Sequence, residues 1–110
     1  MRRVVVTGRG IVSSIGNNAA EVTDALKSGT RGIEAVAEMA EHGFRSRVAG
    51  TIDLDVTQHG DKRTLRFRGS GAAYAHSAMG QAIAEAGLDD ALISNPRTGL
   101  IAGSGGPSTS

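Results

Sequence analysis

The chain has 110 residues, a formal net charge of +1, 39% hydrophobic and 3% aromatic residues, 16 glycines and no cysteine. This length suffices for one small domain, and a net charge so near zero provides no global field that would attract nucleic acid. Without cysteine there is no disulfide framework, no thiolate metal site and no cysteine nucleophile within these residues. The apolar runs are too short for a signal peptide or a membrane span, so we expect a cytoplasmic protein.

The first expected element is a strand over residues 4–6, three consecutive valines. A continuous β-branched run is typical of a strand covered on both faces. The glycines at positions 8 and 10 predict a turn directly after it. A second strand of the same kind is predicted over residues 98–102. Strands separated by helices indicate the α/β class.

Two helices are predicted between these strands. Asn18 precedes the first, with Glu21 three residues later in a capping-box-like arrangement, and Gly29 follows its end. The second covers residues 72–86, where apolar side chains recur every three or four positions before Gly87.

The chain between these helices is less regular. Residues 34–42 predict a short helix ended by Gly43, and residues 44–48 and 50–52 alternate in polarity as extended segments do. Residues 89–94 favour neither helix nor strand.

A strand followed by glycines also occurs in dinucleotide-binding domains. Here Gly8 and Gly10 supply only part of the G-x-G-x-x-G pattern, because Ser13 occupies the third glycine position. A nucleotide-binding α/β domain therefore stays as an alternative with weak support.

Other candidates for chemistry are poor matches to known patterns. His42, His59 and His76 are not spaced as metal ligands, so we expect no metal site. Ser104 lies in a glycine-rich stretch, but Ala102 stands where the G-x-S-x-G nucleophile motif needs glycine. We expect a loop residue at position 104.

The most informative cluster is basic. Four cations, Lys62, Arg63, Arg66 and Arg68, occur within seven positions. Arginine side chains match the geometry of phosphate and carboxylate groups, which favours an acidic or phosphate-bearing partner. A solvated helix end would show the same charge pattern, and the scarcity of aromatic residues argues against single-stranded nucleic acid.

Four stretches together resemble the N-terminal end of the β-ketoacyl-acyl carrier protein synthases, with the bacterial type I enzymes most similar. They are residues 1–18 (MRRVVVTGRGIVSSIGNN), 61–67 (DKRTLRF), 81–87 (QAIAEAG) and 95–106 (NPRTGLIAGSGG). The resemblance covers nearly the whole chain in order.

This resemblance implies a thiolase-like fold, with α-β-α-β-α layers in the full-length family, of which residues 1–110 would form the N-terminal portion of the N-terminal half. It also implies a decarboxylating Claisen condensation of acyl and malonyl thioesters in fatty acid elongation, without a cofactor, by a homodimeric acyltransferase. The family's catalytic cysteine and two histidines lie beyond Ser110 in family order. No catalytic residue is therefore expected within residues 1–110, and this fragment alone should be inactive.

Two peripheral roles carry over from the resemblance. Lys62, Arg63 and Arg66 match the basic positions that receive the acidic acyl carrier protein, and Arg45 is expected to join them. Gly106 matches a residue that lines the acyl pocket. A non-catalytic module that binds carrier protein through the same cations is the main alternative to a synthase segment.

Several residues depart from the family pattern, which has apolar residues where Arg9, Gly60, Arg68 and Ser77 stand. A buried guanidinium at position 9 would be costly unless it were neutralised or reached water. Gly80 lies inside the predicted second helix, where glycine costs about 1 kcal/mol relative to alanine. We therefore expect a weakly stable chain.

Overall fold

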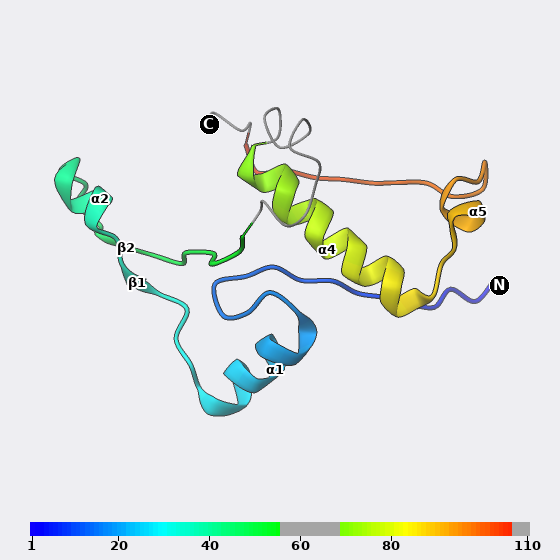
Figure 1. The fold of residues 1–110 in the computed structure, drawn as a ribbon, viewed down its shortest axis with the longest axis horizontal. Coiled ribbons are helices and arrows are strands. Elements are labelled where there is room, and N and C mark those ends of the chain that lie inside the picture. The colour runs from blue at the N-terminus through cyan, green and yellow to red at the C-terminus, as the bar shows by residue number, and fades with distance from the viewer. Residues whose placement is uncertain (56–68, 107–110) are drawn as a thin grey trace.

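A computed structural model describes residues 1–55 and 69–106 of the chain. Figure 1 shows the arrangement of its elements, with the long helix α4 as the largest. In chain order the elements are α1 (Ala19–Ser28), β1 (Glu34–Ala35), α2 (Ala37–Glu41), β2 (Val48–Ala49), α4 (Ser70–Ala86) and α5 (Asp90–Ile93).

Helix α1 begins and ends where its capping residues predict. The Asn18 side chain accepts a hydrogen bond from the Glu21 main-chain N–H at 2.9 Å, and the Glu21 carboxylate accepts one from the Asn17 N–H at 2.8 Å. These bonds satisfy two donors at the N-terminal end, although the second reaches Asn17 where a capping box would use Asn18. Gly29 ends the helix at φ 69° and ψ 28°, in the left-handed region that favours glycine.

Helix α4 confirms the second predicted helix and starts two residues earlier. Gly87 ends it at φ 66° and ψ 32°. The Gly87 N–H donates to the Ala84 carbonyl at 3.2 Å, and the Leu88 N–H donates to the Ile83 carbonyl at 3.2 Å. This is the Schellman arrangement expected of a helix closed by glycine. The undecided residues 89–94 contain the short helix α5, capped by the Asp89 side chain.

Strands β1 and β2 form an antiparallel pair, with Glu34 opposite Ala49 and Ala35 opposite Val48. Helix α2 lies between them in sequence, and the three elements project away from α4 (Figure 1). The predicted helix over residues 34–42 is thus correct for α2 but wrong at its start, where residues 34–35 pair with β2. Gly43, at φ 71°, follows the helix as expected.

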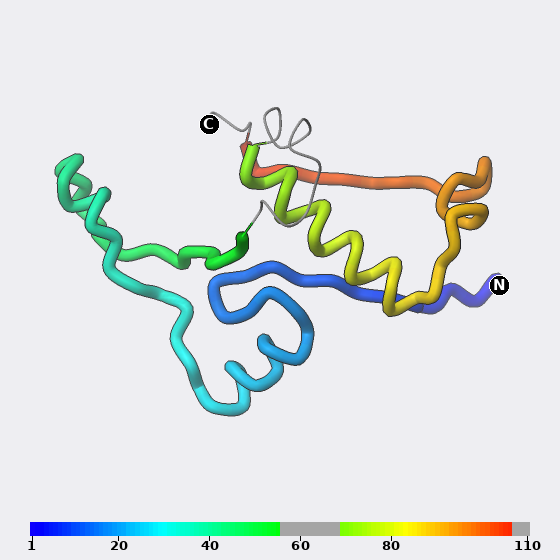
Figure 2. The backbone as a smooth tube through the Cα atoms, in the orientation of Figure 1, coloured from blue at the N-terminus to red at the C-terminus, as the bar shows by residue number. Residues whose placement is uncertain are grey.

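The two predicted buried strands are not formed in the described part of the chain. Val4, Val5 and Val6 follow an extended path, yet their side chains are 93%, 68% and 89% exposed. The other segment is likewise an extended stretch of backbone (Figure 2), and its Leu100 and Ile101 are 73% and 98% exposed. A strand requires a neighbour for its main-chain hydrogen bonds, and valine favours strands because it packs there. Neither segment has such a neighbour among the described residues.

The chain is open rather than closed around a core. Its radius of gyration is 17.0 Å, whereas a compact domain of this length has about 13 Å. Its accessible surface is 9293 Å², against about 5,700 Å² for a compact protein of this mass. Among the described residues the buried ones are small: Ala25, Ala73 and Ser77. The fold mixes helices with a small sheet, and many large apolar side chains among the described residues are exposed, whereas none is fully buried.

Candidate functional site

The glycine-containing segment, residues 8–11 with Gly8 and Gly10, lies directly against helix α4. A Cβ added to Gly8 would overlap the Ala82 carbonyl oxygen and lie 2.9 Å from the Ala86 Cβ. One added to Gly10 would overlap the Ala78 carbonyl oxygen. Glycine at these positions thus allows the close approach of a main-chain segment to a helix, on a face where the helix presents alanines. This approach accounts for the two glycines without a nucleotide phosphate.

Two polar side chains of α4 hold the same segment at alternate residues. The Glu85 carboxylate accepts a hydrogen bond from the Arg9 N–H at 2.6 Å, and the Gln81 Oε1 accepts one from the Ile11 N–H at 3.1 Å. Four residues of helix rise about 6.0 Å, and two residues of extended chain about 6.6 Å. The two spacings match, so the segment can follow α4 with its N–H groups aimed at successive side chains.

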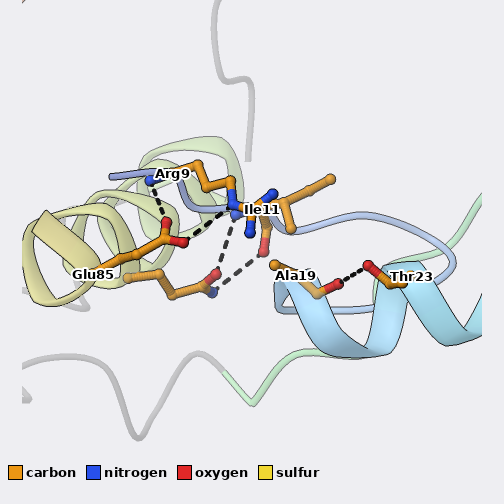
Figure 3. Close-up of polar contacts among 6 residues, drawn as sticks. Arg9, Ile11, Ala19, Thr23 and Glu85 are labelled. Carbon is orange, nitrogen blue, oxygen red and sulfur yellow. Dashed lines mark hydrogen bonds and ion pairs between the residues drawn. The ribbon is translucent and has the colours of Figure 1, made fainter. Parts of the chain in front are cut away.

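Arg9 is exposed and paired, so it meets both conditions under which a guanidinium at this position avoids the cost of burial. Its Nε lies 3.2 Å from the Glu85 Oε1, and the two side chains are 74% and 42% exposed (Figure 3). The hydrogen bonds from the Arg9 N–H and then its guanidinium hold the pKa of Glu85 below the ordinary value of 4.5. Surface pairs of this kind contribute little energy, so the main-chain bond matters as much as the charge.

A cleft of about 680 Å³ opens beside these contacts, between α4 and the start of α1. Its lining includes the polar or charged side chains of Glu21, Asp53, His76 and Gln81. Asn17 also lines the cleft, and its Nδ2 donates to the Asp53 carbonyl. The Asn17 Oδ1 is buried without a hydrogen-bond partner among the described residues.

Most of the predicted carrier-protein residues lie outside the described part of the chain. The carrier-protein residues outside it are Lys62, Arg63 and Arg66. Three other residues discussed from the sequence, His59, Gly60 and Arg68, also lie outside it. Arg45 is described: it lies between α2 and β2 and is exposed. Its association with the other cations stays a prediction.

Gly106 is exposed, and a Cβ added there would meet no atom within 4 Å among the described residues. Its predicted place in an acyl pocket stays a prediction. Two residues upstream, Ser104 belongs to a loop, as expected, and its hydroxyl donates to the Gly106 carbonyl at 2.6 Å.

The described histidines occupy ordinary positions. His42 follows helix α2, where its Nδ1 lies 2.8 Å from the Glu38 carbonyl oxygen. His76 is exposed on α4. Within residues 1–55 and 69–106, no three histidine, aspartate or glutamate side chains cluster as metal ligands would, and no helix is long and apolar enough to cross a membrane.

Sequence reasoning did not assign roles to Gln81 and Glu85, although both lie in a stretch that carries the family resemblance. Their four-residue spacing places them on one face of α4. Polar side chains on an otherwise alanine-rich face of the helix were the feature from which their role could have been suspected. Their partners could not be read from the sequence, because they are main-chain groups about 70 residues away.

Comparisons with known proteins agree on one family. Residues 1–110 match the model described as "Beta-ketoacyl synthase, N-terminal domain". The chain is 53% identical over 105 residues to 3-oxoacyl-[acyl-carrier-protein] synthase 1 of Haemophilus influenzae, covering 96% of this chain and 26% of that protein. It is 50% identical over 109 residues to the protein of the same name from Escherichia coli K12, covering 98% and 27%.

A more distant relative is named granaticin polyketide putative beta-ketoacyl synthase 1, from Streptomyces violaceoruber. It is 33% identical over 104 residues, covering 94% of this chain and 25% of that protein. The chain thus spans about a quarter of the length of the curated relatives it matches.

Proposed function

Since the chain belongs to the beta-ketoacyl synthase family, matching its N-terminal domain over residues 1–110, we propose that it serves as part of a 3-oxoacyl-acyl carrier protein synthase. The reaction is the decarboxylating condensation of an acyl thioester with a malonyl thioester, in fatty acid elongation in the cytoplasm. The observation that carries this proposal is the identity of about 50% to two proteins of that name.

The proposal assigns these residues a supporting share of the enzyme. They form the N-terminal portion of one half of a layered thiolase-like fold, whose full-length members act as homodimers. Condensation needs a thiolate that accepts the acyl chain, and the 110 residues contain no cysteine. The chemistry therefore requires residues outside this sequence, and the chain by itself should not turn over.

Within the enzyme, these residues can contribute the binding of the acyl carrier protein that carries the substrate. Lys62, Arg63 and Arg66, with Arg45, provide cations for an acidic acyl carrier protein, and Gly106 leaves room for the acyl chain. Exposed ion pairs each contribute about 0.2–1 kcal/mol, so we expect weak binding. Such binding is screened over about 8 Å at physiological ionic strength.

Binding of acyl carrier protein can be tested by calorimetric titration of the chain with holo-acyl carrier protein at low and at physiological salt. We expect binding at low salt that weakens with added salt and with Arg63→Glu or Arg66→Glu. Arg97→Glu, an exposed cation elsewhere, is the matched control and should have a smaller effect. Binding indifferent to salt and to both reversals would refute carrier docking by this cluster.

A turnover assay tests the rest of the proposal. Purified chain mixed with acyl and malonyl carrier proteins should form no 3-oxoacyl product. Product formation that survives removal of any host synthase would show that the chemistry does not need the missing thiolate. A module that only binds carrier protein gives the same titration, so sequence following Ser110 in the gene, and a cysteine within it, distinguishes the two.

A further inference from the structure

We propose that Gln81 is a positioning residue, whose side-chain amide clamps both arms of the turn over residues 11–17 and thereby fixes the start of helix α1 relative to helix α4. This role is independent of carrier binding and of the condensation chemistry.

The turn itself is short and locally bonded. The Ser13 N–H donates to the Gly16 carbonyl at 2.9 Å, and the Gly16 N–H donates to the Ser13 carbonyl at 3.3 Å. The chain therefore reverses within the two intervening residues. Ile11 lies on the arm that enters the turn and Asn17 on the arm that leaves it.

The Gln81 amide bonds to both arms. Its Oε1 accepts from the Ile11 N–H at 3.1 Å, and its Nε2 donates to the Ile11 carbonyl at 3.2 Å and to the Asn17 carbonyl at 2.6 Å. Toward Ile11 the amide thus pairs with N–H and C=O together, as an adjacent strand would. A single orientation of the amide satisfies all three bonds, because one of its atoms meets a donor and the other meets two acceptors.

Position 81 requires glutamine for this arrangement. Glutamate offers no donor to the two carbonyls when ionised, and methionine has the length of glutamine but neither donor nor acceptor of useful strength. The site is half-buried, so main-chain groups that lose their partner there are only partly compensated by water.

The bond from Gln81 to Asn17 also fixes where helix α1 begins. Asn17 precedes the cap residue Asn18, and the Asn17 N–H is held by Glu21 in the first turn of α1. Fixing the Asn17 carbonyl therefore fixes the start of the helix. The neighbouring contact of Gly10 with Ala78 limits sliding of the entering arm, so the two contacts together define the register of the segment on α4.

Amide hydrogen exchange in the full 110-residue chain gives the first test. The Ile11 N–H should be protected, and Gln81→Met should accelerate its exchange about tenfold or more. The exchange of the Val22 N–H, bonded inside α1, should change less. Ala75→Met, the same side chain at an exposed position of α4, is the control and should leave Ile11 protected. An Ile11 N–H that exchanges as in an unstructured peptide in the parent chain would overturn the proposal.

A distance measurement separates positioning from general stability. Because the chain has no cysteine, spin labels can be attached uniquely through Asp24→Cys on α1 and Ala84→Cys on α4. We expect one narrow distance distribution that broadens with Gln81→Met, and also with Gln81→Glu at neutral pH, while circular dichroism reports unchanged helix content. Distributions that stay identical in both variants would overturn the role of Gln81, whatever the carrier-binding experiment shows.

Discussion

Two alternate residues of the glycine-containing segment are held by α4 in different ways. Arg9 and Ile11 both direct their N–H groups at α4, but Glu85 also carries a charge that attracts the Arg9 guanidinium. The Gln81 contact is neutral and half-buried, whereas the Glu85 contact is exposed. Salt and pH should therefore act on the Glu85 contact and leave the Gln81 contact unchanged.

The lowered pKa of Glu85 predicts a pH dependence of stability. A carboxyl whose pKa is lower in the folded chain stabilises it above the unfolded value, here the ordinary 4.5, and this contribution is lost as the pH falls through the folded value. We expect the parent chain to exceed Glu85→Gln in urea midpoint at pH 7, and the difference to shrink below pH 4.5. Glutamine retains an acceptor for the Arg9 N–H, so the comparison isolates the charge.

A constant difference between the parent chain and Glu85→Gln from pH 7 to pH 3 would show that the charge does not stabilise the fold. Added salt at pH 7 provides the control, because screening should reduce the difference without protonating the carboxyl.

Among the elements, the helix ends are fixed by residues close in sequence, whereas each strand needs a partner strand from farther along the chain. Asn18, Gly29 and Gly87 each act within a few residues of the helix they delimit. Inside α4, glycine occurs at position 71 in the first turn and at position 80 in the middle of the helix, where it costs most. A Cβ added at Gly80 would meet no atom within 4 Å, although the residue borders the cleft.

Gly80→Ala should therefore stabilise the chain. The substitution removes conformational freedom from the unfolded state without a clash in the folded one, for a gain of about 0.4–1 kcal/mol in the free energy of unfolding. Urea denaturation followed by circular dichroism at 222 nm measures it.

Gly10→Ala is the matched control, since it adds the same methyl group at a position where α4 leaves no room. It should lower the free energy of unfolding by about 1–3 kcal/mol. If both substitutions stabilise, the close approach of the glycine segment to α4 is wrong.

Taken whole, the molecule presents apolar surface that a compact protein would cover. Five of its exposed large side chains lie in the two segments predicted as strands: Val4, Val5, Val6, Leu100 and Ile101. Uncovered apolar patches and unpaired strand edges promote association. The same openness leaves few buried groups to oppose unfolding.

The 110-residue chain should therefore bind the dye ANS strongly and associate as its concentration rises. The double substitution Val5→Ser and Ile101→Ser should reduce both effects, measured by fluorescence and sedimentation velocity. Thr23→Ala and Asp24→Ala, on exposed positions of α1, serve as controls. A sharp cooperative melt from a monomer at high concentration would contradict this expectation.

The sequence by itself determined both ends of α1, the C-terminal end of α4 and the family. Capping residues act over three or four positions, so Asn18, Gly29 and Gly87 could be interpreted without knowing what lies nearby. The four motifs likewise depend only on residue order. Only the tertiary structure decided the strands and the polar contacts: the valines at positions 4–6 favour a strand, but strand formation needs a partner. The role of Gln81 and the pairing of Arg9 depend on groups about 70 residues apart, which meet because two glycines let the main chain approach α4.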